Sequence, residues 1–105
     1  MMKVIAEVSF SPIGTATPSL SKYVTAALAV LISHPEVKYQ LNPMGTVLEG
    51  ERPDIIAVIE EMNEAIFAAG ALRVGTTLKI DERRDKPASM KHKVESVLEG
   101  LKRDA

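Results

Sequence analysis

Two hydrophobic periods alternate along this chain, and their order limits the possible folds more than any other feature of the sequence. Apolar residues recur at every second position over 4–10 and 72–80, which is the period of a strand with one face in a core. They recur at spacings of three and four over 20–31, 55–69 and 90–101, which is the stripe of an amphipathic helix. The pattern therefore predicts a chain in which strands and helices take turns.

Two further short strands are expected at 37–41 and 46–50. The link between them reads Asn-Pro-Met-Gly (42–45), not the Asn-Gly or Asp-Gly pair typical of hairpins. The resulting order is β-α-β-β-α-β followed by a helix, and it predicts an α+β ferredoxin-like sandwich. In that fold a four-stranded antiparallel sheet carries two helices on one face. With 105 residues, the chain is expected to form a single domain over 1–105.

The other face of this sheet would have no helix to cover it. The residues expected there are Ile5, Glu7, Ser9, Arg73, Thr77 and Lys79. The C-terminal helix must also bury an apolar stripe, made of Met90, Val94, Val97, Leu98 and Leu101. Because a single copy leaves both surfaces uncovered, we expect the chain to associate with itself.

The composition argues against several classes of partner. The chain has 13 Lys and Arg against 14 Asp and Glu, with two Tyr, two Phe and no Trp, so it lacks the positive charge and aromatic platforms that nucleic-acid binding needs. No cysteine is present, which excludes disulfides and thiolate chemistry. The N-terminus is too short and too charged for a signal peptide, and no apolar segment approaches the roughly 20 residues that span a bilayer. We expect a soluble cytoplasmic protein without nucleic-acid or membrane partners.

No catalytic or metal-binding motif is evident. His34 and His92 have no further ligands nearby that would complete a zinc site, and the acidic residues of the 81–85 segment do not have the spacing of a calcium loop. Acylphosphatases share the predicted topology and hold phosphate with an arginine in the first loop, but no arginine lies between Ser9 and Lys22. We therefore predict no enzyme, no metal and no cofactor.

The highest density of charge follows the last predicted strand. Lys79, Arg83 and Arg84 belong to a segment in which basic residues outnumber acidic ones. Guanidinium groups bind phosphate or carboxylate through two parallel hydrogen bonds, so these residues could hold an anionic ligand. They could equally form ion pairs between subunits or lie in a solvated loop, and we favour this second interpretation.

Four stretches, AEVSFSPIGT (6–15), SLSKYV (19–24), YQLNPMGTVLEGE (39–51) and LKIDERRDKP (78–87), resemble the small thiamine-binding protein domain family. The resemblance covers nearly the whole chain and implies a ferredoxin-like fold. It also implies a homotetramer built as a dimer of dimers. Finally, it implies non-enzymatic binding of thiamine or its hydroxymethylpyrimidine moiety, as a ligand and not as a cofactor.

The hairpin offers groups that such a ligand needs. Tyr39 could stack on a ring and Met44 could pack on it, while Thr46 and the main chain at Gly45 could form hydrogen bonds. The further candidates for contact with the ligand are Glu7, Ser9 and Glu49. An ordinary turn with Tyr39 in the core remains the alternative. If the hairpin binds no ligand, the protein would be a structural or regulatory oligomer. An enzyme with a site between subunits is the remaining alternative.

Overall fold

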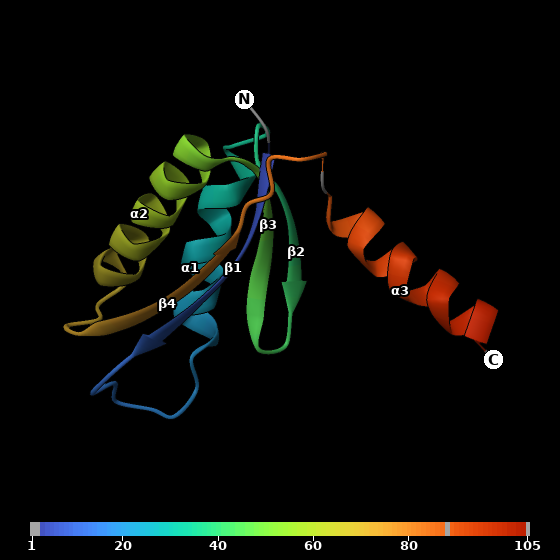
Figure 1. The fold of residues 1–105 in the computed structure, drawn as a ribbon. Helices are drawn as coiled ribbons and strands as arrows, with labels where there is room; N and C mark the ends of the chain where they lie inside the picture. Colours follow the sequence, from blue (N-terminus) through green and yellow to red (C-terminus); the bar gives the residue numbers. More distant parts are fainter. Residues whose placement is uncertain (1–2, 88, 105) are drawn as a thin grey trace.

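The computed structural model describes residues 3–87 and 89–104, whose helices and strands follow the predicted order (Figure 1). The elements are β1 (Lys3–Pro12), α1 (Ser21–Ile32), β2 (Lys38–Asn42), β3 (Gly45–Glu51), α2 (Arg52–Ala68), β4 (Val74–Asp81) and α3 (Met90–Asp104). The last strand starts at Val74, not at Leu72 as the alternation suggested. Leu72 is 94% exposed, because the partner strand β1 ends at Pro12, opposite Val74.

The four strands form one sheet in the order β2-β3-β1-β4, and all neighbours are antiparallel. On the central strand β1, Val8 lies opposite Thr46 of β3 and Leu78 of β4. This arrangement confirms the predicted α+β ferredoxin-like fold.

Both α1 and α2 lie on one face of the sheet (Figure 1). α2 contacts β1, β3 and β4 and packs along α1. The fully buried side chains between these layers are aliphatic or Met: Val4, Val8, Leu31, Leu48, Ile55, Val58, Met62 and Ile66. Removal of this apolar surface from water is the main force that holds the two layers together.

The ends of α2 follow local signals in the sequence. Pro53 occupies the first turn, where a missing N–H costs nothing, and Asp54 places a negative charge near the positive end of the helix dipole. The helix ends at Ala68, and two residues later Gly70 has a φ of +115°, which is unfavourable for residues with a side chain. The chain can therefore turn sharply from α2 toward β4.

The register assigns the expected residues to the sheet face that carries no helix, which we call the open face. Ile5, Glu7 and Ser9 of β1 lie there opposite Asp81, Lys79 and Thr77 of β4. Arg73, which was also expected there, lies just before β4 and outside the paired residues of the strand. Its carbonyl still accepts a hydrogen bond from Ile13 N at 2.8 Å.

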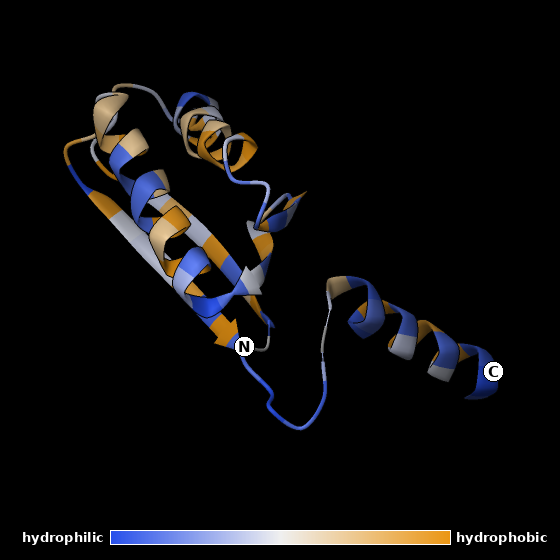
Figure 2. Ribbon diagram, turned by 90° about the horizontal axis from the view of Figure 1, so that it is seen from above, coloured by the Kyte–Doolittle hydropathy of each residue, from blue (hydrophilic) through white to orange (hydrophobic). Residues whose placement is uncertain are grey.

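α3 extends away from the sandwich (Figure 1), and its apolar residues follow one side of the helix (Figure 2). Val94, Val97, Leu98 and Leu101 are each more than half exposed. From Val94 onward the expected stripe is thus present, and nothing within residues 3–87 and 89–104 covers it, whereas Met90 at its start is half-buried. None of the helices in these residues has both the length and the apolar character needed to cross a membrane.

Candidate functional site

A cavity of about 270 Å³ opens where the β2–β3 turn faces the first half of α1. Its lining comes from β1 (Val8, Ser9, Phe10, Pro12), from the turn and its flanks (Leu41, Asn42, Pro43, Met44, Gly45, Thr46), from α1 and the residue before it (Leu20, Tyr23, Val24, Ala27, Leu28) and from α2 (Met62, Ile66). The cavity therefore lies on the helix-covered side of the sheet, at the end where β1 stops.

The turn that forms one wall is determined by its own sequence. Asn42 lies opposite Gly45 in the register, so Pro43 and Met44 are the two turn residues. Pro43 fixes its φ at about −65°, and no non-glycine residue of the described chain has a positive φ. These angles fit a type I turn, for which Asn, Pro and Gly are favoured at the first, second and fourth positions. Met44 is consequently held out at the rim of the cavity, where it is 89% exposed.

Gly45 allows the hairpin to approach β1 closely. A Cβ atom at this position would lie 3.2 Å from the carbonyl oxygen of Val8 and 3.4 Å from Cγ of Glu7. The first distance is shorter than ordinary van der Waals contact, and the second lies at its lower limit. The contact with β1 therefore accounts for a glycine here, independently of any ligand.

The residues that line the cavity are all uncharged. The side chains of Thr46 and Tyr23 bring polar groups, and the rest of the wall is largely aliphatic, Met or Phe. Alternation directs the side chain of Asn42 to the open face, where its Oδ1 accepts a hydrogen bond from Gln40 at 3.1 Å. Thr46 is only 7% exposed, so a hydrogen bond from a ligand to its hydroxyl would form away from bulk water. Pockets for drug-sized ligands measure about 300–1,000 Å³. A cavity slightly below that range suits a small, flat and mostly apolar ligand.

Four of the candidate ligand-binding residues, Ser9, Met44, Gly45 and Thr46, lie together in this lining. Ser9 stands between two residues that face the helices, so alternation directs its side chain to the open face and leaves its main chain at the cavity. Tyr39 is not part of the lining. It lies on the edge strand β2 and is 43% exposed.

The two candidate carboxylates lie on the opposite side of the sheet. Glu7 is opposite Val47 of β3 and Lys79 of β4, and Glu49 is opposite Ile5 and Lys38. All of these positions belong to the open face. The sheet therefore separates Glu7 and Glu49 from the cavity, and neither carboxylate borders a ligand bound there.

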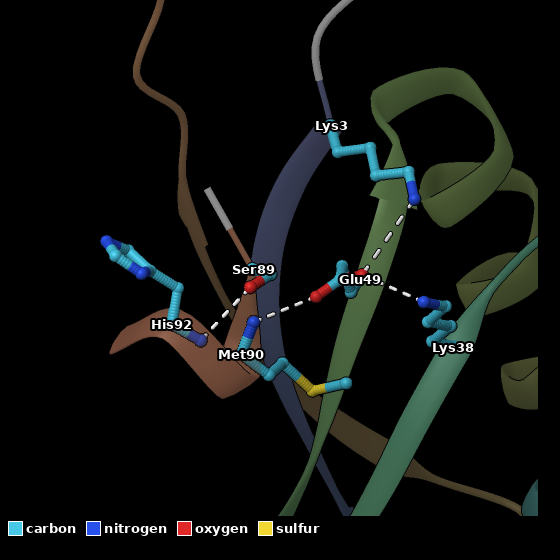
Figure 3. A network of polar contacts seen from close by, with 6 residues as sticks. All are labelled: Lys3, Lys38, Glu49, Ser89, Met90 and His92. Carbon is cyan, nitrogen blue, oxygen red and sulfur yellow. Dashed lines mark hydrogen bonds and ion pairs between the residues drawn. The ribbon is translucent and has the colours of Figure 1, made fainter. Parts of the chain in front are cut away.

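Glu49 instead joins the sheet to α3 (Figure 3). It is 4% exposed, and its Oε1 accepts a hydrogen bond from the backbone N–H of Met90 at 2.8 Å. The Nζ atoms of Lys3 and Lys38 each lie 3.9 Å from the other carboxylate oxygen. Ser89 caps the same helix by accepting a hydrogen bond from His92 N at 3.0 Å, as its position in the sequence suggests. These contacts satisfy two free N–H groups of the first turn and place a negative charge at the positive end of α3.

The arginines of the charged segment are engaged within the chain. Arg83 donates two hydrogen bonds to Asp85, at 2.7 and 2.5 Å, and this pair lowers the pKa of Asp85 to about 2. Arg84 donates to Glu82 at 2.6 Å, and Arg52 of α2 donates to the same carboxylate at 3.1 Å. Neither Arg83 nor Arg84 lines the cavity. Lys79 lies on the open face, opposite Glu7.

Sequence reasoning did not assign α1 to the site. Tyr23, Val24 and Leu28 lie on a helical stripe that looks like any core-facing stripe, although they form the wall opposite the turn. Leu41 directly precedes the predicted turn and Asn42 is its first residue, so both could have been included in the candidate site. For α1 the sequence contains no such local signal, since its contribution depends on how the helix sits over the sheet.

Comparison with known proteins identifies the family of the chain. A family model described as thiamine-binding protein matches residues 6–98. The UPF0045 protein YqgV of Bacillus subtilis is 47% identical over 96 residues, covering 89% of this chain and 92% of the relative. A UPF0045 protein of Methanothermobacter thermautotrophicus is 44% identical over 99 residues, covering 93% and 99%.

A solved structure shows the same fold. The hypothetical protein MJ1052 of Methanocaldococcus jannaschii superposes with a TM-score of 0.84 and is 39% identical, covering 92% of this chain and 97% of that one. The family model and these relatives extend over most of the chain, from β1 into α3. The chain belongs to the thiamine-binding protein family of UPF0045 proteins.

Proposed function

We propose that this protein binds thiamine, or the hydroxymethylpyrimidine moiety of thiamine, in the cavity between the β2–β3 turn and α1. Membership of the thiamine-binding protein family supports the class of ligand. The position of the proposed site rests on the cavity of about 270 Å³, whose uncharged wall has a few polar groups among apolar ones. Such a wall matches a flat heteroaromatic ring with hydrogen-bonding groups at its edge.

Each wall has a role in this proposal. The hydroxyl of Thr46 and the main chain at Gly45 offer hydrogen bonds to the ring nitrogens and the amino group. Met44 and Leu41 are 89% and 55% exposed without ligand and can pack on a face of the ring. Tyr23 lies on the α1 side of the same cavity.

The working form in this proposal is a homo-oligomer that performs no catalysis. The relatives named above carry no enzyme name. The exposed stripe of α3 and the exposed part of the open face, around Glu7 and Lys79, supply surfaces that a second copy could cover. Ile5 and Glu49 on the same face are already buried within the single chain. A structural oligomer without a ligand is the second candidate, and the same uncovered surfaces favour it.

Isothermal titration calorimetry with thiamine and hydroxymethylpyrimidine tests the proposal. A saturating ligand at about 100 times its dissociation constant should stabilise the native state by about 2.7 kcal/mol and raise the melting temperature. Thr46→Val keeps the shape but removes the hydroxyl, which should weaken binding by about 1–3 kcal/mol. Ser96→Ala on the exposed side of α3 is the control and should bind like the wild type. If neither compound gives heat or a melting shift at millimolar concentration, the structural candidate replaces this proposal.

A further inference from the structure

Resting on the proposed function, we infer that the cavity selects unphosphorylated ligands. It would accept the neutral pyrimidine ring and reject the same ring when its hydroxymethyl group carries a phosphate ester. The class of ligand is thus the free alcohol and not the activated phosphate.

The charge of the wall is the first argument. Val8, Phe10, Leu41, Met44 and the other lining residues include no Lys, Arg, His, Asp or Glu. A phosphate monoester carries about 1.5–2 negative charges at neutral pH. One methylene separates that phosphate from the ring, so burial of the ring brings the phosphate to the rim, where it loses water without gaining a cation.

The position of the arginines is the second argument. Arg83 and Arg84 follow Asp81, which is opposite Ile5 near the start of β1, whereas the lining of the cavity begins only at Val8. The three residues from Ile5 to Val8 span roughly 10 Å of strand, and the arginines lie farther from the cavity than Ile5 does. Both guanidinium groups also donate to carboxylates of their own segment. A phosphate at the cavity would therefore not reach them.

The start of α1 is the feature that could favour an anion, because free N–H groups at a helix start attract negative charge. The N–H groups of Tyr23 and Val24, which do line the cavity, already donate to the carbonyl of Leu20 at 3.0 and 3.1 Å. Ser21 and Lys22 are not among the lining residues. The Nζ of Lys22 lies 5.6 Å from the centre of the Tyr23 ring and 3.8 Å from the Cβ position of Gly70, on the side of α2. The positive end of α1 is thus not open to the ligand.

Titration of the wild-type protein with hydroxymethylpyrimidine and with its phosphate ester tests the inference. The two compounds differ only by the phosphate, and the alcohol should bind at least about tenfold more tightly, which corresponds to about 1.4 kcal/mol. If both bind and the ester binds as tightly or more tightly, the inference is overturned while the proposed function stands. If neither compound nor thiamine binds, the proposed function fails and the inference falls with it.

A positive charge placed at the rim should weaken the preference for the alcohol. Met44 is an exposed turn residue, so Met44→Lys should fold normally and put an ammonium group beside the position of the phosphate. Its ratio of affinities, alcohol over ester, should fall by about fivefold or more relative to the wild type. Met44→Gln keeps a similar length without charge, and Ser96→Lys adds the same charge on α3, so both should retain the wild-type preference for the alcohol. An unchanged ratio in Met44→Lys, with the alcohol still bound, would show that the phosphate does not lie at this rim and would overturn the inference.

Discussion

The backbone N–H of Met90 donates a hydrogen bond to Oε1 of Glu49 at 2.8 Å and so joins α3 to a strand that lies 41 residues earlier in the chain. Because Glu49 is only 4% exposed, its carboxylate depends on this donor and on the charges of Lys3 and Lys38 for stabilisation. The relationship explains how a helix that projects from the sandwich still has a defined starting point.

Replacement of Glu49 should therefore destabilise the fold and release the start of α3. Glu49→Ala leaves the Met90 N–H without its partner and should lower the free energy of unfolding by about 1–3 kcal/mol. Glu49→Gln retains an acceptor and should cost less. Urea unfolding measures the loss of stability, and hydrogen exchange of the Met90 amide measures the release of the start of α3. The exposed neighbour Glu51→Gln serves as control; equal loss in Glu51→Gln and Glu49→Ala would contradict the assigned role.

Gly45 and Gly75 provide a matched pair for the packing of the hairpin. A Cβ at Gly45 would lie 3.2 Å from the carbonyl oxygen of Val8, whereas one at Gly75 would meet its nearest atoms, both of Ser11, at 3.9 Å. Gly45→Ala should thus lower the free energy of unfolding by about 1–3 kcal/mol, and Gly75→Ala should be tolerated. Thermal and urea denaturation compare the two variants. A fully stable Gly45→Ala would show that β3 can move away from β1 without loss.

Much of the fold could be predicted because its signals are local. The period of two in β1, the stripe of α2 and the glycine that follows α2 each reflect a property that a short window of sequence contains. Leu72 marks the limit of this reasoning. It continues the alternation of β4, yet it lies past the last residue of the partner strand, and the position of that partner is a tertiary property.

The candidate site was only partly predictable for the same reason. The Asn-Pro-Met-Gly turn stood out locally, and it does form one wall of the cavity. The opposite wall, with Tyr23 and Val24, comes from a helix whose stripe also fills the core. Alternation along β1 does predict the open face for Glu7, but the sequence does not show that the cavity lies on the other side of the sheet, because that depends on how α1 sits over the strands.

His34 links the end of α1 to α2 through two carboxylates. Its Nδ1 lies 2.8 Å from Glu36 and its Nε2 lies 2.5 Å from Glu61 of α2. The hydrogen bonds to Glu36 and Glu61 raise the pKa of His34 above 6.5, and a backbone hydrogen bond together with His34 lowers the pKa of Glu36 below 4.5. The stabilisation from His34 is complete below pH 6.5 and is lost as the pH rises through the pKa of His34 in the folded state. The stabilisation from Glu36 is complete above pH 4.5 and is lost as the pH falls through the pKa of Glu36 in the folded state.

Stability from this cluster should therefore be greatest between about pH 4.5 and 6.5. His34→Gln should flatten the decrease in the free energy of unfolding that the wild type shows from pH 6 to 8, and Glu61→Gln should reduce it. Glu60→Gln, one residue away on α2, leaves both partners of His34 in place and should keep the wild-type profile. Urea unfolding at a series of pH values provides the measurement, and a wild-type profile in His34→Gln would refute the role of the cluster.

The stripe of α3 should hold the copies of the proposed oligomer together. Val97 and Leu98 are 63% and 52% exposed in the single chain, so their replacement should not disturb its core. Val97→Asp together with Leu98→Asp would place charges in an apolar contact between copies, and sedimentation equilibrium should then show the 11.4 kDa species in place of the oligomer. Ser96→Asp adds a charge on the other side of the same helix and should leave assembly intact, since Ser96 lies two positions from both Val94 and Leu98 and so about 160° around the helix from each. Circular dichroism should show that all variants remain folded. A wild-type protein that sediments at 11.4 kDa at micromolar concentration would contradict the proposed assembly, because α3 would then keep its stripe in water.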